Sequence, residues 1–578
     1  MKINLKNILS AMALVVMTSC VGDLNTLPLN PTDVTSESAY GKDEQSYLQG
    51  LAKLYMQIVS NDTQNLIVDD GGSSEFIRTF WSVQEISTDA CKIAWEEDSW
   101  AQDLNTQKWS PEHNHMIYSV YVRTLQGVTY INEYLRQTSA DKLAQRGVSA
   151  EVAKKIDGFR AEARFLRAFF YWVSLDAFGN IPFAVESTPI GGGNNPPQTE
   201  RAKVFEFCVK ELEELAADGS PMPEAKSNYP RADKGACLAL LARMYLNAEV
   251  YTGKAMWAEA KDACERIYDL GKYSICSDYP AMFRGDNGEN PEVLKEFIFA
   301  ASFDDTHTRS WGGTTFLTLA TVHSSDAGQS YHKLQGIKGN SAWGGARVPY
   351  EYVKKYFDVK NPDYNFDPGY ACTTEELLKA DHKLGYDVKD NRGRMFYIKG
   401  RKESMYGKNT EGKSNLYDFM CGWSCLKFNN TPHDMAVLGD KSEMDWETKA
   451  LSTEFCNIDY PLFRLGEIHL IYAEACMHVG GSADTQLAEL AARAGIAPKT
   501  QAEVTVDWLV AERARELMWE GHRRTDLIRY GLFTSGDFLW PYKGGVEKGT
   551  ALEAHKTLFA IPNSERESNP ALKQNVGY

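Results

Sequence analysis

Helical periodicity dominates the pattern of apolar and polar positions along the chain. Between Ala161 and Phe178 the apolar residues recur at three- and four-residue spacing, which is the period of one face of an α-helix. They are Phe165, Leu166, Phe169, Trp172, Val173 and Leu175. Gly179 and Pro182 follow, and such residues end helices. The pattern predicts a core helix that carries several large aromatic side chains.

Two further segments predict a helical hairpin. The first carries the apolar stripe Leu238, Leu241, Tyr245 and Leu246, and the second carries Trp257, Ala260 and Ile267. The segments meet at Gly253, as in an antiparallel helix pair of the tetratricopeptide type. Two more helices are predicted from about residue 463 to 479 and from about 506 to 520, because Gly480-Gly481 and Gly521 follow them.

Residues 301–455 differ from the helical segments in composition and pattern. They are rich in Gly, Trp and Tyr and contain short mixed segments such as residues 394–399, which is typical of loops with a few strands. We therefore predict an all-α protein, with a helical scaffold over residues 41–300 and 456–578 and a loop-rich insertion over residues 301–455. Ligands usually bind to loops held on a rigid frame, so the insertion is expected to contribute to a ligand site.

The N-terminus has the pattern of a cleavable lipoprotein signal peptide over residues 1–19. Lys2 and Lys6 precede an apolar run over residues 8–17, and the small residues Thr18-Ser19 stand before Cys20. The run is about half as long as a membrane-spanning helix needs to be. Cys20 is the predicted lipidation site, and residues 20–40 are the predicted tether. Ordinary secretion without lipidation is the alternative.

Net charge and cysteine usage narrow the ligand classes. The formal charge is −16 and becomes more negative when the signal peptide with its two lysines is removed, which argues against nucleic acid and anionic headgroups as ligands. Neutral ligands are not excluded by the charge. Ten cysteines follow Cys20 without a regular framework, and Cys208, Cys237 and Cys476 fall on helical patterns, so we expect buried thiols and build no disulfide scheme.

One segment matches the phosphate-binding loop pattern in full: residues 407–414, Gly-Lys-Asn-Thr-Glu-Gly-Lys-Ser. A working loop of this kind needs a buried strand before it and an amphipathic helix after it. Residues 401–404 and 415–418 supply neither pattern. We therefore expect the match to be accidental and Lys413 to be dispensable for function.

Other motifs for chemistry are weak or missing. His113 with His115, and Cys421 with Cys425, could suggest a metal, but neither pair has a second matched pair at zinc spacing. The chain contains no Gly-x-Ser-x-Gly elbow and no His-Glu-x-x-His motif. Paired carboxylates for glycoside hydrolysis are set by three-dimensional geometry, so their sequence positions neither support nor exclude a hydrolase.

Five sequence blocks stand in a characteristic order along the chain. They are Ala161–Phe183; Arg231–Gly235 with Leu240–Leu246; Pro461–Arg464 with Ile471–Ala475; Glu516–His522 with Asp526–Arg529; and Ile561-Pro562, Asn569-Pro570 and Gln574–Tyr578 at the end. Together they resemble the SusD/RagB family of outer-membrane lipoproteins, and five blocks in the right order are far more specific than any one. The signal peptide and Cys20 agree with this resemblance independently.

The resemblance implies a SusD-like all-α fold of four tetratricopeptide-like helix pairs with a loop-built ligand site. It also implies a lipid-anchored, non-catalytic protein at the cell surface, which captures a glycan and delivers it to a SusC-like TonB-dependent outer-membrane transporter. Starch or a related α-glucan is the first expected ligand, and a different polysaccharide such as dextran or a host glycan is the alternative. A secreted glycoside hydrolase and a structural adaptor that contacts only protein remain as hypotheses from other classes.

Six residues match the glycan contacts of a starch-binding member of this family. The aromatic ones are Trp95, Trp311 and Trp343, and the polar ones are Asp70, Arg78 and Asp98. Asp98 stands where that member has asparagine, which removes an amide donor. Such a set suits a sugar, whose apolar C–H face stacks on an aromatic ring while its hydroxyls form hydrogen bonds at the rim. Core packing is the alternative for each tryptophan, although the Gly-Gly pairs after Trp311 and Trp343 favour exposed loops.

A structural calcium site of the same member matches only in part. Asp286, Glu289 and Asp459 are the acidic candidates, while Gly288 and Asn457 fall where acids would be wanted. The resemblance implies no other cofactor.

Overall fold

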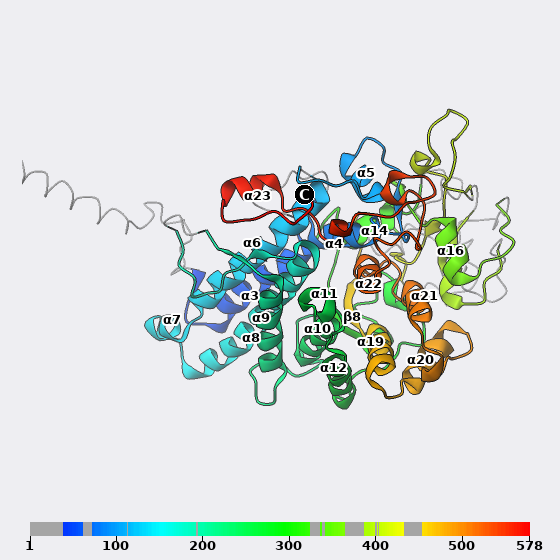
Figure 1. The fold of residues 1–578 in the computed structure, drawn as a ribbon. Coiled ribbons are helices and arrows are strands. Elements are labelled where there is room, and N and C mark those ends of the chain that lie inside the picture. Colours follow the sequence, from blue (N-terminus) through cyan, green and yellow to red (C-terminus); the bar gives the residue numbers. More distant parts are fainter. Residues whose placement is uncertain are drawn as a thin grey trace, which may run out of the picture.

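The computed structural model describes residues 39–61, 72–112, 114–191, 195–323, 336–337, 342–364, 386–398, 401–402, 404–432 and 454–578. Cys20, Asp70 and His113 lie outside the described residues, as do the signal peptide and most of the tether. Helices dominate the regular structure of the described chain (Figure 1), which confirms the all-α fold. The domain boundaries expected at residues 41, 301 and 456 stay predictions.

Three long helices form the N-terminal part of the scaffold: α3 (Glu44–Val59), α6 (His115–Gln137) and α8 (Ala150–Phe178). Both α3 and α6 pack against α8. The helix α8 begins after Ser149, whose hydroxyl accepts a hydrogen bond from the backbone N–H of Val152, and it ends at Gly179 with φ of 74°. The sequence predicted only its second half, because the first turns are mostly exposed and carry few apolar residues.

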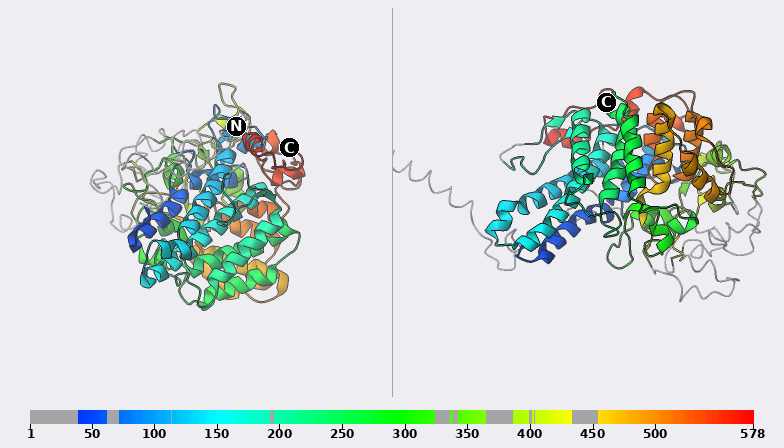
Figure 2. Two further views of the ribbon diagram at one scale, coloured as in Figure 1. Left: turned by 90° about the vertical axis from the view of Figure 1, so that its left-hand side faces the viewer. Right: turned by 90° about the horizontal axis from the view of Figure 1, so that it is seen from below.

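The next helices pack as successive neighbours, and Figure 2 shows them side by side in two further views. They are α9 (Arg201–Ala216), α10 (Lys234–Leu246), α12 (Trp257–Asp269) and α19 (Leu465–Val479). Each packs against the next, and α9 also packs against α8. The short helix α11 (Ala248–Thr252) joins α10 to α12 and ends at Gly253, so the predicted hairpin is confirmed.

The C-terminal segment contributes α20 (Asp484–Ala494), α21 (Val506–Glu516), α22 (Arg523–Arg529) and α23 (Asn563–Ser568). The sequence predicted that α21 would continue to Glu520, but it ends at Glu516. The chain turns instead at Trp519, which has a positive φ of 63°. This turn directs the Trp519 indole into the core, where its N–H donates to the carbonyl of Ala90 at 3.0 Å.

Shorter helices and strands lie between these long helices in the chain. The helices are α4 (Phe76–Glu85), α5 (Ser99–Thr106), α14 (Gly313–Leu319) and α16 (Tyr350–Phe357). Four antiparallel strand pairs occur in the described chain: β1 (Lys92–Ile93) with β5 (Ala346–Arg347), β2 (Ile181–Pro182) with β3 (Gln198–Thr199), β4 (Phe297–Ala301) with β8 (Tyr460–Arg464), and β6 (Phe396–Tyr397) with β7 (Ser424–Cys425). The described helices α7 (Ala140–Gln145) and α13 (Pro291–Leu294) lie elsewhere in the chain.

A buried network of ion pairs holds the C-terminal helices to β4 and β8. Arg464 binds Glu296 at 2.9 Å, Glu516 at 2.6 Å and Glu520 at 2.6 Å, and all four side chains are almost completely buried. Burial alone would raise the pKa of Glu516, but the surrounding arginines, including Arg493 and Arg464, lower it well below its usual range. Two of the sequence blocks therefore meet at one buried cluster.

The described residues contain no helix that is both long enough and apolar enough to cross a membrane. Their nine cysteines are all buried and none forms a disulfide. This agrees with the expectation that the thiols act as small apolar groups in the core.

Candidate functional site

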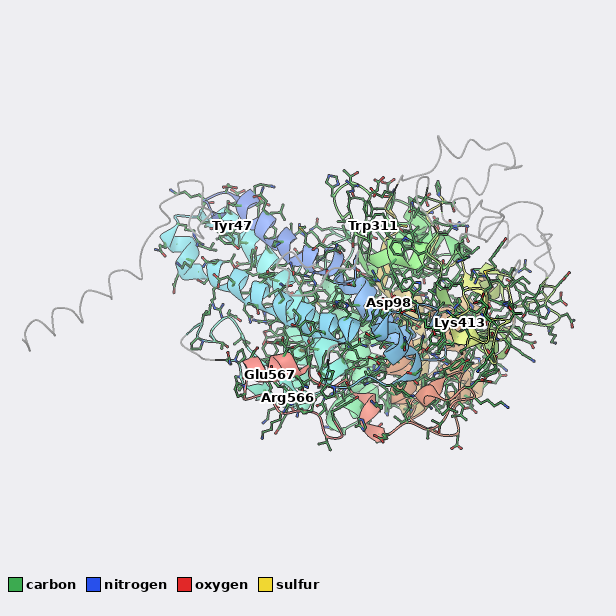
Figure 3. The ribbon with its side chains drawn as sticks, turned by 90° about the horizontal axis from the view of Figure 1, so that it is seen from above. Tyr47, Asp98, Trp311, Lys413, Arg566 and Glu567 are labelled. Carbon is green, nitrogen blue, oxygen red and sulfur yellow. The ribbon has the colours of Figure 1, made fainter. Side chains whose placement is uncertain are left out.

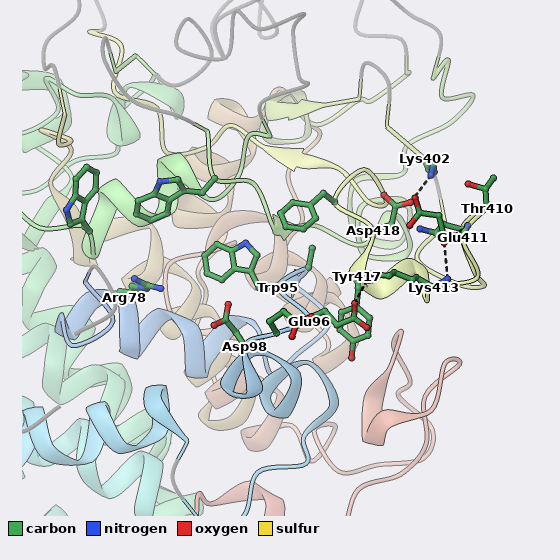
Figure 4. Close-up of a pocket in the computed structure, with 16 residues that line it drawn as sticks. Arg78, Trp95, Glu96, Asp98, Lys402, Thr410, Glu411, Lys413, Tyr417 and Asp418 are labelled. Atoms are coloured by element: carbon green, nitrogen blue, oxygen red, sulfur yellow. Dashed lines mark hydrogen bonds and ion pairs between the residues drawn. The ribbon is translucent and has the colours of Figure 1, made fainter. Parts of the chain in front are cut away.

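A wide cleft of about 1170 Å³ opens where α4, α5 and the loops of the insertion meet (Figure 4). Its lining residues are Arg78, Ala94, Trp95, Glu96, Glu97, Asp98, Trp311, Trp343, Lys402, Asn409, Thr410, Glu411, Lys413, Tyr417, Asp418 and Phe419. Five of the six residues expected from the sequence are therefore brought together, and the sixth, Asp70, lies outside the described residues. The volume exceeds the usual range for a single drug-sized ligand, so the cleft suits an extended one.

Antiparallel pairing of β1 with β5 brings Trp95 and Trp343 to the same end of a two-stranded ribbon. Trp95 follows β1, Trp343 precedes β5, and the N–H of Ala94 donates to the carbonyl of Gly345 at 2.9 Å. Gly345 has φ of +101°, and a Cβ there would lie 2.4 Å from the indole nitrogen of Trp95. A glycine is therefore required for the Trp95 ring to lie against this backbone.

Trp311 completes the aromatic surface from the start of α14. The centroids of Trp311 and Trp343 lie 5.8 Å apart with their planes tilted by 45°, and Trp311 also packs on Phe455 at 4.6 Å. Trp343 is held by its backbone N–H, which donates to the carbonyl of Leu319 at 3.0 Å. All three tryptophans are half-buried, so each ring is supported from behind and open to the cleft.

Glu75 connects two parts of the site and was not predicted from the sequence. Its carboxylate accepts hydrogen bonds from the N–H groups of Ile77 at 3.0 Å and Arg78 at 2.7 Å, which caps α4. The same carboxylate accepts one from the N–H of Gly313 at 2.7 Å, in the turn directly after Trp311. Burial raises the pKa of Glu75 to about 7 against the effect of these donors. An acidic residue directly before a helix was the only sequence signal for this role.

Arg78 and Asp98 supply charge beside the rings. Arg78 is buried in α4 and its guanidinium carbon lies 4.5 Å from the ring centroid of Phe316. Asp98 stands at the N-cap of α5, but its carboxylate makes no capping hydrogen bond to that helix. Its backbone N–H donates to the carbonyl of Trp95 at 3.4 Å, which keeps it next to that ring (Figure 4).

The segment with the phosphate-loop pattern forms part of the cleft wall instead. A bridge joins Lys408 to Ser414, and the side chain of Asn409 accepts hydrogen bonds from the N–H groups of Glu411 at 3.0 Å and Lys413 at 2.9 Å. Only a single 3₁₀ turn follows, so the helix that a phosphate loop needs is missing there. Lys413 lines the cleft, and its dispensability for function stays a prediction.

The acidic candidates for calcium do not form a cluster of three carboxylates. Among the described residues, no group of three or more His, Cys, Asp or Glu side chains is arranged to hold a metal ion. Both carboxylate oxygens of Asp459 accept hydrogen bonds, from the hydroxyl of Tyr229 at 2.7 Å and from the N–H of Phe303 at 3.0 Å. Gly288 lies so close that a Cβ would be 2.5 Å from that carboxylate. His115 and the Cys421/Cys425 pair form no such group either, and calcium binding at Asp286, Glu289 and Asp459 stays a prediction.

Figure 3 shows Trp311, Asp98 and Lys413 on the same half of the molecule, away from the far ends of α3 and α8. Successive packed helices that carry an open cleft, walled by aromatic and charged side chains on loops, define the class of a helical binding protein for extended ligands. The comparisons with known proteins identify the class more closely.

The sequence model of the protein family described as SusD family matches residues 295–578. A second family model, described as "Starch-binding associating with outer membrane", matches residues 43–246. The chain is 30% identical to the starch-binding protein SusD of Bacteroides thetaiotaomicron, and the match covers 99% of both proteins. The chain belongs to the SusD family.

Solved structures agree on the fold. A SusD superfamily protein from Parabacteroides distasonis has a TM-score of 0.64 and 17% identity, over 94% of this chain and 100% of that one. Surface glycan-binding protein A from Bacteroides thetaiotaomicron, solved with laminarihexaose, has a TM-score of 0.63 and 18% identity, over 92% and 99% of the two chains.

Proposed function

We propose that the protein binds a neutral glucan in the cleft, with an α-glucan of the starch type as its first ligand. The observation that carries the proposal is the tilt of 45° between Trp311 and Trp343 at a centroid distance of 5.8 Å. Two sugar units stacked on these rings would follow a curved path, as an α-1,4-linked chain does. The relative that is 30% identical over the whole chain is named as starch-binding, which supports the same ligand.

The charges of the cleft support a neutral ligand. Glu96, Glu97, Asp98, Glu411 and Asp418 line it, against the three cations Arg78, Lys402 and Lys413. The excess of carboxylates disfavours uronates and sulfated glycans by like-charge repulsion. Sugar hydroxyls, in contrast, form hydrogen bonds to carboxylates and cations alike.

A β-1,3-glucan is the second candidate. The structural neighbour solved with laminarihexaose shares the fold, and chains of this linkage are also curved. Its identity of 18% supports a shared fold but no shared ligand, so binding experiments decide between the two linkages.

The proposed role is capture and not cleavage. The protein would hold the glucan at the cell surface, anchored through Cys20, and pass it to a SusC-like TonB-dependent transporter. The match to a family model described as associating with the outer membrane supports this location.

Calorimetric titration of the mature protein tests the proposal. Maltoheptaose, dextran oligosaccharides, laminarihexaose and a polyuronate are titrated separately, and the glucan mixtures are then assayed for new reducing ends. We expect micromolar to millimolar binding of maltoheptaose, none of the polyuronate, and no new reducing ends. Failure to bind any glucan would overturn the proposed function, and new reducing ends would favour the hydrolase alternative.

A further inference from the structure

The cleft has a second wall, formed by Lys402 and residues 409–411, 413 and 417–419, which the family resemblance did not assign to ligand binding. The aromatic side chains of this wall are Tyr417 and Phe419, which stand two residues apart and line the same cavity as the three tryptophans. Both are half-buried, so part of each ring is open to the cleft.

The aromatic rings of the second wall line the same cleft as the tryptophans. Trp343 is bridged to His323 through the backbone, and the ring of His323 lies 5.3 Å from that of Phe419. Trp311 lies on the other side of Trp343 at 5.8 Å. His323 therefore links the backbone of Trp343 to the ring of Phe419, and Trp311, Trp343, Phe419 and Tyr417 all line the one cleft. A chain that stacks on the tryptophans would meet Phe419 and Tyr417 as it grows longer.

Hydrogen bonds to the scaffold hold this wall in place, in addition to the packing of Tyr417 on Met405, Leu416 and Tyr542. The buried guanidinium of Arg347 donates to the carbonyls of Leu416 at 2.6 Å and Cys421 at 3.0 Å. The hydroxyl of Tyr542 donates to the carbonyl of Met405 at 3.0 Å. A wall fixed in this way loses little conformational entropy when a ligand binds. The faces of Tyr417 and Phe419 that line the cleft are therefore available for another role.

Both lysines of the second wall form ion pairs, and one of these pairs crosses the cleft to Glu96. Lys413 lies 3.6 Å from Glu96, which precedes α5, and Lys402 lies 2.7 Å from Asp418. Such exposed pairs exchange readily with sugar hydroxyls, because each contributes little to stability. Their place in the same cleft as Tyr417 and Phe419 matches the combination of flat rings and polar groups that sugars require.

We propose that Tyr417 and Phe419 form a second glucan subsite, a proposal that rests on the proposed function. This subsite binds the sugar units of longer chains beyond those that stack on the tryptophans. The protein then selects for chain length. A trisaccharide fills the tryptophan surface alone, whereas a heptasaccharide contacts both walls.

The test compares two chain lengths on the purified mature protein. Maltotriose and maltoheptaose are titrated by calorimetry, with laminaritriose and laminarihexaose in parallel, and the result is taken from the series that the wild type binds. We expect the double variant Tyr417→Ala/Phe419→Ala to lose about tenfold in affinity for the long sugar and less than about twofold for the short one. Trp311→Ala should lower the affinity for both.

Two controls separate binding from folding. Tyr417→Leu/Phe419→Leu keeps apolar volume against the loop but removes the flat rings, and it should show the same selective loss with an unchanged melting temperature. Lys408→Ala changes an exposed residue of the same loop that does not line the cleft, and it should leave both affinities unchanged. Equal losses for both lengths, or no loss for the long sugar, would overturn the second subsite alone. A wild type that binds neither series would overturn the proposed function and this subsite together.

Discussion

Asp98 places a carboxylate beside Trp95 where the resemblance led us to expect an amide donor. A carboxylate only accepts hydrogen bonds, so any sugar hydroxyl that meets it donates. We expect Asp98→Ala to weaken binding of the cognate glucan about tenfold, since hydrogen bonds to charged groups contribute about 1.5 kcal/mol or more. Asp98→Asn keeps an acceptor and should cost less than about threefold. Calorimetry on both variants checks this, and equal losses would contradict the acceptor role.

Glu75 makes the stability of the site depend on pH. Its pKa is about 7 in the folded protein against an ordinary value of 4.5, because burial disfavours the charged form. The folded state then binds the proton more strongly than the unfolded state, so this contribution is fully present below about pH 4.5 and is lost as the pH rises towards 7.

Glu75→Gln removes that titration. We expect the difference in unfolding free energy between wild type and variant to shift in favour of the variant between pH 5 and pH 7, as measured by urea denaturation at both values. A difference that is independent of pH would contradict the assignment. The variant should also weaken glucan binding, because one of its two oxygens is replaced by a donor that faces either the N–H of Ile77 or the N–H groups of Arg78 and Gly313.

At the residue scale, the sequence anticipated the aromatic rings but not what supports them. Trp311 and Trp343 could be placed on exposed loops because Gly-Gly follows each of them. Glu75 could not be found, since its second partner, Gly313, is remote in sequence. Tyr417 and Phe419 were missed because the neighbouring Gly-rich segment was considered only as a phosphate loop.

At the scale of elements, the buried network around Arg464 joins α21 to the paired strands β4 and β8. We expect Glu516→Ala to destabilise the protein by about 3–5 kcal/mol, because it removes one buried carboxylate from each of the buried arginines Arg392, Arg464 and Arg493. Urea unfolding measures the loss. Lys499→Ala, which breaks only an exposed pair with Glu503, is the matched control and should leave stability unchanged. A small effect of Glu516→Ala would contradict the structural role of the network.

Long periodic helices such as α8 were predictable, because their apolar stripe is a local property of the sequence. The early end of α21 was not, since it depends on the Trp519 indole finding the carbonyl of Ala90 in the core. The pairing of β1 with β5 was equally unpredictable from the sequence. Each strand has only two residues, and only the folded scaffold brings them together to place Trp95 beside Trp343.

At the scale of the whole molecule, the helical scaffold carries the cleft, while the N-terminus is predicted to anchor the protein to the membrane. We expect Cys20→Ala to release the protein from the outer membrane or to leave its signal peptide uncleaved, because the variant lacks the acylated thiol. Fractionation of cells and surface labelling check this outcome. Unchanged membrane association with intact surface exposure would contradict the lipid anchor.

The central claim is that the three tryptophans of the cleft bind the glucan. If each ring covers on the order of 50 Å² of sugar at about 25 cal/mol per Å², the three together contribute roughly 4 kcal/mol, or close to a thousandfold in affinity. Trp95 also packs edge-on against Trp100 and Phe316, and Trp311 packs on Phe455, so removing these rings costs some stability.

Calorimetric titration of the Trp95→Ala/Trp311→Ala/Trp343→Ala variant with the glucan that the wild type binds, alongside its melting temperature, is the most direct measurement. The account predicts that binding becomes undetectable while the variant still unfolds cooperatively, at a temperature within several degrees of the wild type. Binding retained by a folded variant, or a collapse of the fold itself, would contradict it.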